Sequence, residues 1–569
     1  MAGEDNFDVV KQRCDELRNA FGARNEINNK FTDIYLMKEP DGLPDDLDVK
    51  KTISPDGHNA IQAVVRLLAS TSPKFSVPTD KTKPEDKERV DGLEKFANGV
   101  WYANNRVRQS PMEMDIVHSG ALWAEFACGV ELTDDLLEHA QGGSKAAVIR
   151  AERLQELTPV VFTGPWPINT VFPEYSDHGM VFFHRKLTVK AGVVLDAWGK
   201  LAIEAGVDES NRYADVDLCE SLDDIVKGVW IDGESKPIFF GEHKLPRMNV
   251  VCNIVSGSRV HVKEEEKRHG FLHGLVKSGL HDRQTLAATV LYTNIFRHGI
   301  NPQMVYKANS PENDIVIDKS MSGTIKIGVN ESLEPLQQQA IDRFLLDAIN
   351  MAEQKAEATT IFRQSMGGNI AGGNAPYSSI ALLNQASRLP LVDIQKGCAS
   401  GIGQMMEIAI DMVRERGSKA TVQGEKGVVE IKSSDIKGPV LFDVILDVDL
   451  PQDQRQNAQT AAQLTEGDWP LTPDRWVHEN LLGIGQSTEV MKEIGKEKIM
   501  KATILANVQA EIQKIMAKSQ QALQPQQGQP IPQQSPEQMP QESAQSGLPL
   551  SAPIDLQAQG QVPPEQGML

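Results

Sequence analysis

Apolar positions recur at helical spacing along much of this chain, and the longest such pattern lies between about residues 270 and 417. Its first helix is predicted to begin with Asp282 as N-cap, to run from Arg283 to His298 and to end at Gly299. A wide apolar face is typical of a helix that packs on one side. On this helix it comprises Leu286, Ala287, Val290, Leu291 and Ile295.

A short β-rich segment and a longer helix follow the first helix. Strand-like runs occur at residues 304–306 and 315–317. The second helix is predicted to start at Glu334-Pro335, with proline in its first turn, and to continue to about Met366. At 1.5 Å per residue its length is roughly 50 Å, longer than most helices of globular proteins.

A glycine-rich run, residues 367–376, interrupts the helical pattern. A third helix is expected to begin after Ser378 and to kink at Pro390, where the ring removes a helical hydrogen bond. The pattern then changes to strands between residues 420 and 448.

The two faces of the strand around residues 440–446 both look apolar. Phe442, Val444 and Leu446 share one face, while Leu441 and Ile445 lie on the other. This pattern favours a strand covered on both sides. Another run, residues 428–431, is a second candidate strand.

The first part of the chain is predicted to be helical. Its expected helices are residues 8–36, with a break at Gly22, then 54–70, 84–106 and 112–128. Ser54 is the expected N-cap of the second, with Pro55 in the first turn. Residues 130–155 are polar and interrupted by Gly142-Gly143, which leaves a hairpin and a helical remnant as alternatives.

From Thr158 onward, short runs rich in β-branched and aromatic residues predict a mixed α+β segment. Gly164-Pro165-Trp166-Pro167 is expected to form a rigid turn between two of these strands. The candidate strands are residues 159–162, 170–173, 181–188, 227–231, 238–240 and 250–255.

The C-terminal part divides into a helical segment, residues 452–515, and a tail from about Ser519 that is rich in Gln and Pro. The tail has four acidic residues and neither Lys nor Arg. We expect the tail to be disordered, because its apolar surface is too small to offset its chain entropy.

Composition narrows the classes of function. The 569 residues carry a formal charge of −20, which argues against wrapping DNA with basic side chains. The five cysteines are scattered and form no CxxC pair, so neither a disulfide framework nor a zinc knuckle is expected. The acidic N-terminus does not resemble a signal peptide, and no apolar run reaches 18 residues, so no membrane span is expected.

The order of elements between residues 270 and 417 resembles the portal proteins of tailed bacteriophages. The run from Leu291 to Pro302 looks like the end of that family's first stem helix. The resemblance implies an α+β fold with these parts: residues 1–269 wing, 270–300 first stem helix, 301–333 clip, 334–366 second stem helix, 367–377 tunnel loop, 378–451 tunnel helix and wing return, 452–518 crown and 519–569 disordered tail.

The glycine run is the first candidate for a DNA contact. In the family a loop at this position faces the DNA channel, whereas spacing alone favours a flexible linker between helices. The run lacks the Lys and Ser/Thr of a phosphate-binding P-loop, so ATP hydrolysis by this chain is not expected. The implied channel residues are Gly367, Gly368, Asn369, Ile370, Ala371, Gly372, Gly373 and Asn374.

Basic residues on the second long helix are candidates for facing DNA in a channel: Arg343, Lys355 and Arg363. The competing interpretation, favoured for any one of them, is a solvated face or a face that forms salt bridges between subunits.

Two groups have the composition of metal sites, but surface positions are the favoured interpretation of both. One group is His269, His273 and His281 with the acidic run 264–266, and glycine stands where a zincin motif needs glutamate. The other is Asp443, Asp447 and Asp449. We therefore expect no metal and no cofactor, and no catalytic residue emerges from the sequence.

The resemblance implies a channel rather than an enzyme. It predicts a homo-oligomeric ring, usually of twelve subunits in the family, at one capsid vertex of a virion and in the host cytoplasm during assembly. Implied partners are the terminase large subunit, head–tail adaptor or neck proteins, the major capsid and scaffold proteins, and double-stranded DNA, with no membrane. The alternatives are an α+β hydrolase or nuclease that uses acidic clusters, and a non-portal virion structural protein.

Overall fold

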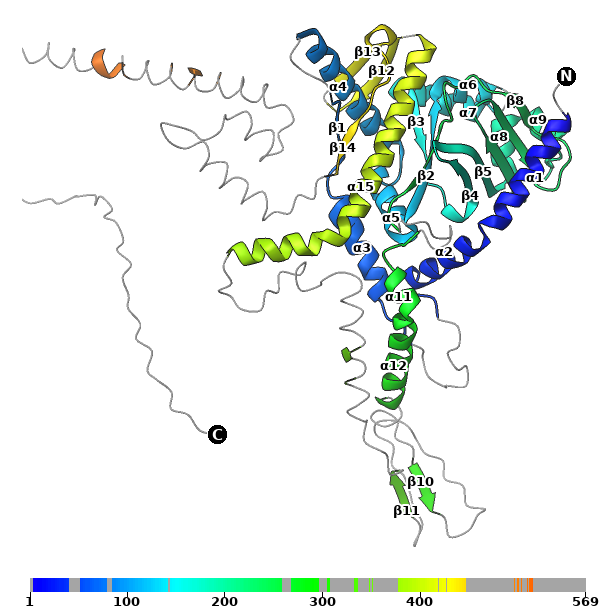
Figure 1. Ribbon diagram of the computed structural model, residues 1–569, viewed down its shortest axis with the longest axis vertical. Coiled ribbons are helices and arrows are strands. Elements are labelled where there is room, and N and C mark those ends of the chain that lie inside the picture. Colours follow the sequence, from blue (N-terminus) through cyan, green and yellow to red (C-terminus); the bar gives the residue numbers. More distant parts are fainter. Residues whose placement is uncertain are drawn as a thin grey trace, which may run out of the picture. The chain divides into compact units, whose positions relative to one another are not determined.

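The computed structural model describes two compact units, Met1–Asp453 and Gln454–Leu569. In the second unit the described residues are helical positions between 496 and 514. In the first, the described ranges are 4–39, 52–78, 84–141, 144–257, 268–295, 304–307, 332–335, 377–417, 419–425 and 427–446, with helical residues at 347, 350 and 351. The fold is mixed α+β, as expected (Figure 1).

The N-terminal helices follow the predicted pattern, with two corrections at their ends. They are α1 (Glu4–Ala20), α2 (Gly22–Tyr35), α3 (Asp56–Leu68), α4 (Pro84–Val107) and α5 (Met112–Trp123). The predicted break at Gly22 is confirmed at Phe21, between α1 and α2. Helix α3 starts one residue after Pro55, although the Ser54 hydroxyl still accepts a 3.4 Å hydrogen bond from the Asp56 amide.

Helix α5 was predicted to reach Cys128 but ends at Trp123. Ala124 adopts a left-handed conformation with φ 63°, which stops the helix. A strand, β2 (Glu125–Leu132), begins immediately after it. Because β2 is almost completely buried, apolar residues occupy the positions expected of a buried strand and those expected of a buried helix. Hydrophobic periodicity therefore could not distinguish a strand from a helix here.

Two antiparallel sheets make up the β-rich part. The first has the order β3-β2-β9, with β3 at Val160–Thr163 and β9 at Val250–Ile254. The second is a five-stranded meander in the order β4-β5-β6-β7-β8. Its strands are β4 (Val171–Ser176), β5 (Gly179–Lys190), β6 (Asp215–Leu222), β7 (Val226–Ile231) and β8 (Phe239–Glu242).

The predicted strands of this region are confirmed, and the proline-rich turn lies between β3 and β4. Strand β6 was missed because its acidic residues, Asp215, Asp217 and Glu220, fall on both faces and obscure the apolar pattern. The polar segment before β3 forms two helices, α6 (Thr133–Gln141) and α7 (Lys145–Leu157), instead of a hairpin. Helices α8 (Ala191–Trp198) and α9 (Lys200–Glu204) lie between β5 and β6 in sequence.

The long helix α15 (Tyr377–Arg416) crosses the main core. From Leu391 onward, the buried side chains of this helix include Cys398, Ile402 and Met406. The helix packs on α5, β2 and β9. Its ribbon bends part-way along (Figure 1). Pro390, where a kink was predicted, lies within the helix and does not end it.

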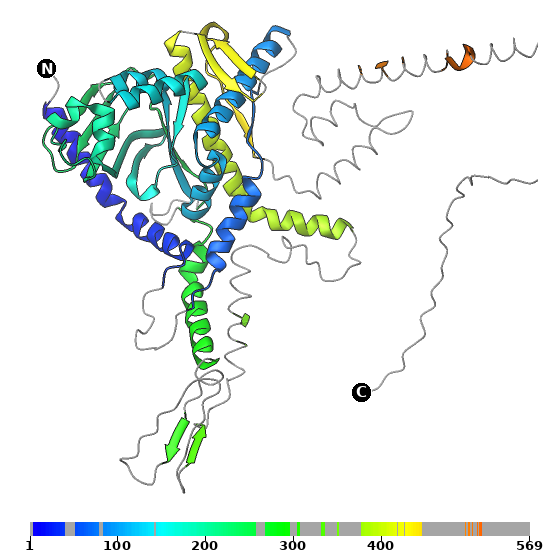
Figure 2. The same cartoon turned by 180° about the vertical axis from the view of Figure 1, so that it is seen from behind.

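Two small sheets complete this core. The hairpin of β12 (Lys419–Gly424) and β13 (Gly427–Lys432) packs on α4 (Figure 2). Strand β1 (Lys74–Ser76) pairs with β14 (Asp443–Ile445). The predicted strand 440–446 is shorter, since β14 spans Asp443–Ile445, and its second face is not covered. Leu441 and Ile445 on that face are 64% and 49% exposed, whereas Phe442 and Leu446 are buried.

The first long helix of the 270–417 stretch is interrupted near its start. Helix α11 (His273–Ser278) ends at Gly279, φ 64°, and α12 (Leu280–Ile295) follows directly. Asp282 therefore lies inside the first turn of α12 and is not its N-cap. Residues 296–299, at the predicted end, lie outside the described residues.

The predicted apolar face of α12 is not its most buried side. Leu286 is 45% exposed, Ala287, Val290 and Leu291 are half-buried, and the side chain of Ile295 lies outside the described part. The buried stripe is polar instead and comprises His281, Gln284, Thr285, Thr289 and Thr293.

An antiparallel pair of strands follows α12 in the chain. Strand β10 (Met304–Lys307) confirms the predicted strand at 304–306, and it pairs with β11 (Ser332–Pro335). Pro335 therefore ends a strand, so the second long helix cannot start there. Asp347, Asn350 and Met351 are helical, and the predicted strand 315–317 lies outside the described residues.

Helix α1 packs on the five-stranded sheet around a buried histidine. Phe7 and Cys14 of α1 join Trp230 in one apolar cluster. His184 is fully buried and its ring stacks between Phe172 and Trp230, with centroid distances of 5.5 and 5.8 Å. Its Nδ1 lies 3.0 Å from the carbonyl oxygen of Glu220, while Nε2 has no hydrogen-bond partner among the described residues.

Burial lowers the pKa of His184 from 6.5 to about 4. Between those values the unfolded chain binds a proton that the folded protein excludes. We therefore expect the contribution to stability to be complete above pH 6.5 and to be lost as pH falls toward 4, by about 3 kcal/mol in total. Urea unfolding at a series of pH values measures this loss.

The matched variants are His184→Phe, which keeps a stacked ring without a proton site, and His178→Phe at an exposed position of the turn before β5. The first is expected to flatten the pH dependence between 6.5 and 4, and the second to leave it unchanged. If the free energy of unfolding changed equally with pH in His184→Phe and in the native chain, His184 would not be the group responsible for the loss of stability.

Close packing around α15 gives a second test. A Cβ on Gly397 would lie 2.5 Å from the carbonyl oxygen of Val255 and 2.6 Å from its Cα. Gly397→Ala is therefore expected to lower the free energy of unfolding by about 1–3 kcal/mol, although alanine is the better helix former. Gly92→Ala in α4, where a Cβ meets nothing within 4 Å, is expected to stabilise by up to about 1 kcal/mol. Chemical denaturation of both variants measures these changes in the free energy of unfolding. Equal changes in the two variants would refute the packing argument.

Candidate functional site

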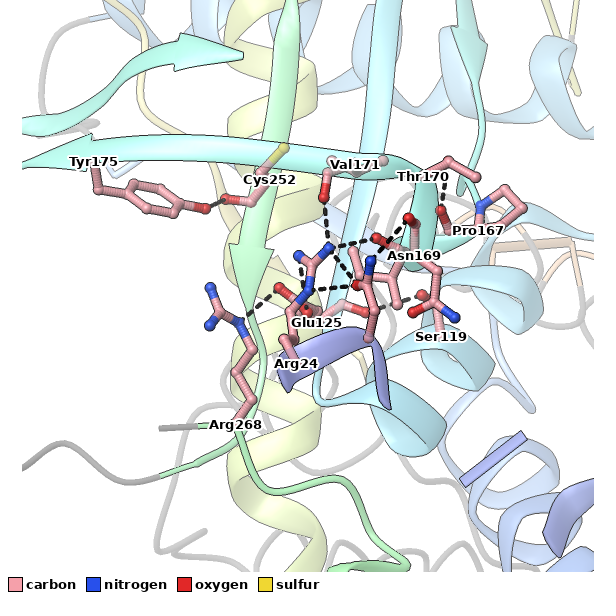
Figure 3. Close-up of polar contacts among 12 residues, drawn as sticks. Arg24, Ser119, Glu125, Pro167, Asn169, Thr170, Val171, Tyr175, Cys252 and Arg268 are labelled. Carbon is pink, nitrogen blue, oxygen red and sulfur yellow. Dashed lines mark hydrogen bonds and ion pairs between the residues drawn. The ribbon is translucent and has the colours of Figure 1, made fainter. Parts of the chain in front are cut away.

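The strongest buried polar feature is a charge cluster of Arg24, Glu125 and Arg268 (Figure 3). The Arg268 Nε donates a 2.8 Å hydrogen bond to Glu125 Oε2. The Arg24 Nη1 lies 3.5 Å from Glu125 Oε1. All three residues are only 3% exposed. One carboxylate thus lies between two guanidinium groups in the interior.

Each member of the cluster comes from a different part of the chain. Glu125 is the first residue of β2, directly after the left-handed Ala124. Arg24 lies on the buried side of α2 with Asn28. Arg268 forms a β-bridge with Gly257 and stands five residues before α11. The cluster therefore joins α2, the three-stranded sheet and the segment that leads to α12.

Further contacts fix Arg24 in place. Its Nη2 donates to the carbonyl oxygens of Ile168 and Val171, at 2.9 and 2.7 Å. Its guanidinium carbon lies 4.2 Å from the centroid of the Phe21 ring, and that of Arg268 lies 5.5 Å from the same ring. Such contacts favour a desolvated cation. Burial lowers the pKa of Arg24, Glu125 raises it, and Arg268 lowers it.

The segment after Arg268 is attached to α5 by its backbone. The Phe271 amide donates a 2.7 Å hydrogen bond to the Ala121 carbonyl. A Cβ on Gly270 would lie 2.4 Å from the Leu122 carbonyl oxygen, so only glycine permits this approach. The entry to α11 is therefore held by an ion pair, a hydrogen bond and close packing.

A second attachment lies along α12 itself. Residues 52–54, called here the strap, run beside its buried threonines. The Thr52 amide donates to the Thr289 hydroxyl at 3.2 Å, and that hydroxyl donates to the Thr52 carbonyl at 3.2 Å. The Ser54 amide donates to the Thr285 hydroxyl at 3.4 Å. We call this set of contacts the hydroxyl ladder.

Most of the site residues predicted from the sequence lie outside the described residues. They are the channel candidates Gly367, Gly368, Asn369, Ile370, Ala371, Gly372, Gly373 and Asn374, and the basic candidates Arg343, Lys355 and Arg363. These assignments stay predictions.

The histidines are only partly brought together. The rings of His269 and His273 stack with centroids 4.2 Å apart, and burial, followed by the charge on His269, lowers the pKa of His273. His281 is instead buried on α12. Asp443 is exposed on β14, while Asp447, Asp449 and residues 264–266 lie outside the described part. Within that part, no group of three or more His, Cys, Asp or Glu residues is placed to hold a metal.

The charge cluster was not predicted. A signal existed at Glu125, the only charged residue between Gly120 and Val130, because an isolated charge in an apolar run requires a buried partner. Arg268 ends the run Lys263-Glu-Glu-Glu-Lys-Arg268, which looks solvent-exposed by composition. Only the fold reveals that Arg24 and Arg268 lie near Glu125.

All five cysteines are free thiols, four of them buried. The described helices include none that is both long and apolar enough to cross a membrane. No protein-family model and no curated protein matches this sequence.

Among solved structures, the chain is similar to one whose description is "Neck of empty GTA particle computed with C6 symmetry". The TM-score is 0.39 and the sequences are 9% identical, over 76% of this chain and 90% of that chain. A TM-score this low does not establish a shared fold, so the likeness carries no argument about function.

The charge cluster makes a direct prediction. Glu125→Gln removes the negative charge that faces both guanidiniums while it keeps the shape of the side chain. We expect the free energy of unfolding to fall by about 3–5 kcal/mol, because two cations stay buried. Urea denaturation measures the change.

The matched control is Glu174→Gln, which removes a carboxylate from a surface pair with Arg13, 2.7 Å apart and about 40% exposed on both sides. A half-exposed pair of this kind is worth at most about 1 kcal/mol. Similar losses of unfolding free energy in Glu125→Gln and Glu174→Gln would show that the buried cluster stabilises the fold no more than a surface ion pair.

Proposed function

We propose that this chain is a portal protein, a subunit of a ring-shaped channel at one capsid vertex through which double-stranded DNA enters and leaves. The observation that carries the proposal is an out-and-back path in the first unit. The chain departs through α12, forms the paired strands β10 and β11, and returns through α15 into the main core. This is the order of elements in which the sequence resembles portal proteins.

In the proposal, different segments along this path have different roles. The two sheets and their helices supply a body with a large apolar core. The charge cluster and the hydroxyl ladder hold α12 to that body at its base. The pairing of β10 with β11 brings residues 304–307 and 332–335 together. In the proposal the segment from residue 304 to residue 335 docks the terminase large subunit and later the head–tail adaptor or neck proteins.

The proposed mechanism is passive. Energy for DNA movement comes from a separate ATPase, and the net charge of −20 suits a channel wall that does not hold phosphates. The loop at residues 367–376 is the proposed DNA contact, and Arg343, Lys355 and Arg363 are the proposed basic positions. Major capsid and scaffold proteins are the proposed partners around the ring, which we place in the virion and, during assembly, in the host cytoplasm.

Electron microscopy and mass photometry of the purified full-length chain test the proposal. We expect rings of about twelve subunits, the usual number in the resembled family, with a hole wide enough for a DNA duplex. If the chain is monomeric alone, it is expressed with its capsid and scaffold proteins, and the vertex is then imaged.

A closed particle without a channel in both preparations would overturn the proposal. DNA cleavage by the purified chain with added Mg²⁺ would instead support the nuclease alternative. A virion location without ring symmetry would support a non-portal structural protein.

A further inference from the structure

Histidines gather where α2, α3, α5 and α11 meet the base of α12 (Figure 1). A Cβ on Gly57 of α3 would lie 2.4 Å from a methyl group of Ile34 in α2 and 3.7 Å from one of Leu272, just before α11, so these elements are in close contact. Five of the twelve histidines of the chain lie at this junction, and they are called here the junction histidines: His58, His118, His269, His273 and His281.

The most enclosed of them is His281, in the first turn of α12. It is 3% exposed, and neither of its ring nitrogens has a hydrogen-bond partner among the described residues. A neutral imidazole has one N–H donor and one acceptor nitrogen, whereas an imidazolium has two donors and a full charge. Burial without acceptors costs the charged ring far more than the neutral one. The closed contact between α12 and the body therefore excludes a proton from His281.

Two carboxylates act on His281 against this exclusion. Burial, the largest cause, lowers the pKa of His281, while Asp282 of the same helix and Asp56 of α3 raise it. Asp282 is exposed, and Asp56 already accepts a 3.3 Å hydrogen bond from Gln284. The two carboxylates thus offset only part of the effect of burial, and the ring stays neutral while the contact is closed.

A second pair of junction histidines flanks Tyr35, the last residue of α2. The ring centroids of His58 and His118 each lie 4.8 Å from that of Tyr35. Burial lowers the pKa of His118, Asp115 raises it, and His58 lowers it. When both rings are protonated, like charges face each other across one tyrosine, which opposes the packing of α2, α3 and α5.

The stacked pair before and in α11 has the same property. The rings of His269 and His273 are in contact, and Lys277 of α11 adds a third positive charge nearby. Burial lowers the pKa of His273, and His269 and Lys277 lower it further. Acid therefore adds charge of one sign on both sides of the joint between the body and α12.

The contacts that hold α12 beyond this joint are weaker than those before it. The ion pair of Arg268 with Glu125 precedes Gly279, whereas the hydroxyl ladder follows it and consists of hydrogen bonds between neutral groups. Gly279 has φ 64°, and a Cβ there would meet nothing within 4 Å, so the backbone has room to turn at this residue. Helix α12 can leave the strap while the attachment through Arg268 stays in place.

We propose that the base of α12 is a proton-operated switch, in which protonation of His281 below about pH 6.5 releases α12 from the strap and from α3. Above that pH the ring is neutral and the contacts are closed. The released state binds the proton that the closed state excludes, so the closed state loses stability as pH falls. The other junction histidines add charge in the same pH range and favour release. This inference goes beyond the proposed function and does not depend on it, because it concerns contacts within one chain.

Hydrogen–deuterium exchange of the full chain, resolved to single amides, tests the switch. The amides of Thr52 and Ser54 donate to hydroxyls of α12, so they lose their protection when α12 leaves the strap. Their rates are measured at pH 7.5 and 5.5 and corrected for the intrinsic dependence of exchange on pH. The amides of α4 are the reference, because α4 contains no histidine and packs on the hairpin of β12 and β13, which contains none either.

We expect the protection of Thr52 and Ser54 to fall about tenfold between pH 7.5 and 5.5, because a histidine in water is mostly neutral at the first pH and mostly protonated at the second. Both amides are expected to exchange faster than those of α4 at either pH, as a local opening requires. His281→Gln, which keeps a polar side chain without a proton site in this range, is expected to remove most of the fall. The matched control His178→Gln, at an exposed turn, is expected to retain it.

Protection of Thr52 and Ser54 that does not change with pH in the native chain would overturn the switch, whether or not the variants fold. Exchange of these amides at the rate of the α4 amides would also overturn it, since this would indicate unfolding of the whole body. An equal fall in folded His281→Gln and in the native chain would show that His281 is not the responsible group. None of these outcomes depends on whether the chain forms a ring.

Discussion

The burial of Glu125 between two arginines is the interaction on which the arrangement of this chain most depends. A carboxylate and two guanidiniums in the interior incur a large desolvation penalty, which is offset only if their geometry is held accurately. Here it is held by the Phe21 ring and by two backbone carbonyls that accept from Arg24. An apolar cluster could tolerate small displacements of its members. A buried ion cluster tolerates few, so it specifies how α2, β2 and the entry to α11 meet.

This constraint explains why α12 does not need an apolar anchor. Its buried face consists of threonines, a glutamine and a histidine, and its larger apolar side chains are partly exposed. Directional hydrogen bonds to the strap specify one register, whereas an apolar stripe would permit several. Leu286 and Tyr292 of the same helix remain partly exposed, at 45% and 55%.

The sequence predicted most elements whose patterns are local. Helix breaks, proline-opened helices and alternating strands depend on neighbouring residues, and these predictions are largely confirmed. The errors have a common physical origin in tertiary contacts. Residues 125–128 looked helical because residues 125–130 of β2 are all buried and mostly apolar. Helix α12 was expected to pack by Leu286 because its real partner, residues 52–54, is more than 200 residues away in the sequence. The charge cluster was missed for the same reason, because no local feature of the sequence pairs Arg24 with Glu125 or Arg268.

The glycines of α15 show how such distant constraints enter a sequence that looks ordinary. Gly397 and Gly401 weaken the helix locally, by about 1 kcal/mol each relative to alanine. The structure places the backbone of Val255 against the first and the ring of Phe126 against the second, closer than any Cβ allows. The helix thereby packs against the backbone that follows β9 and against the Phe126 ring of β2, and β2 begins with Glu125. Close packing along α15 and the ion cluster at the start of β2 therefore act on the same strand, which couples the returning helix of the excursion to the base of the departing one.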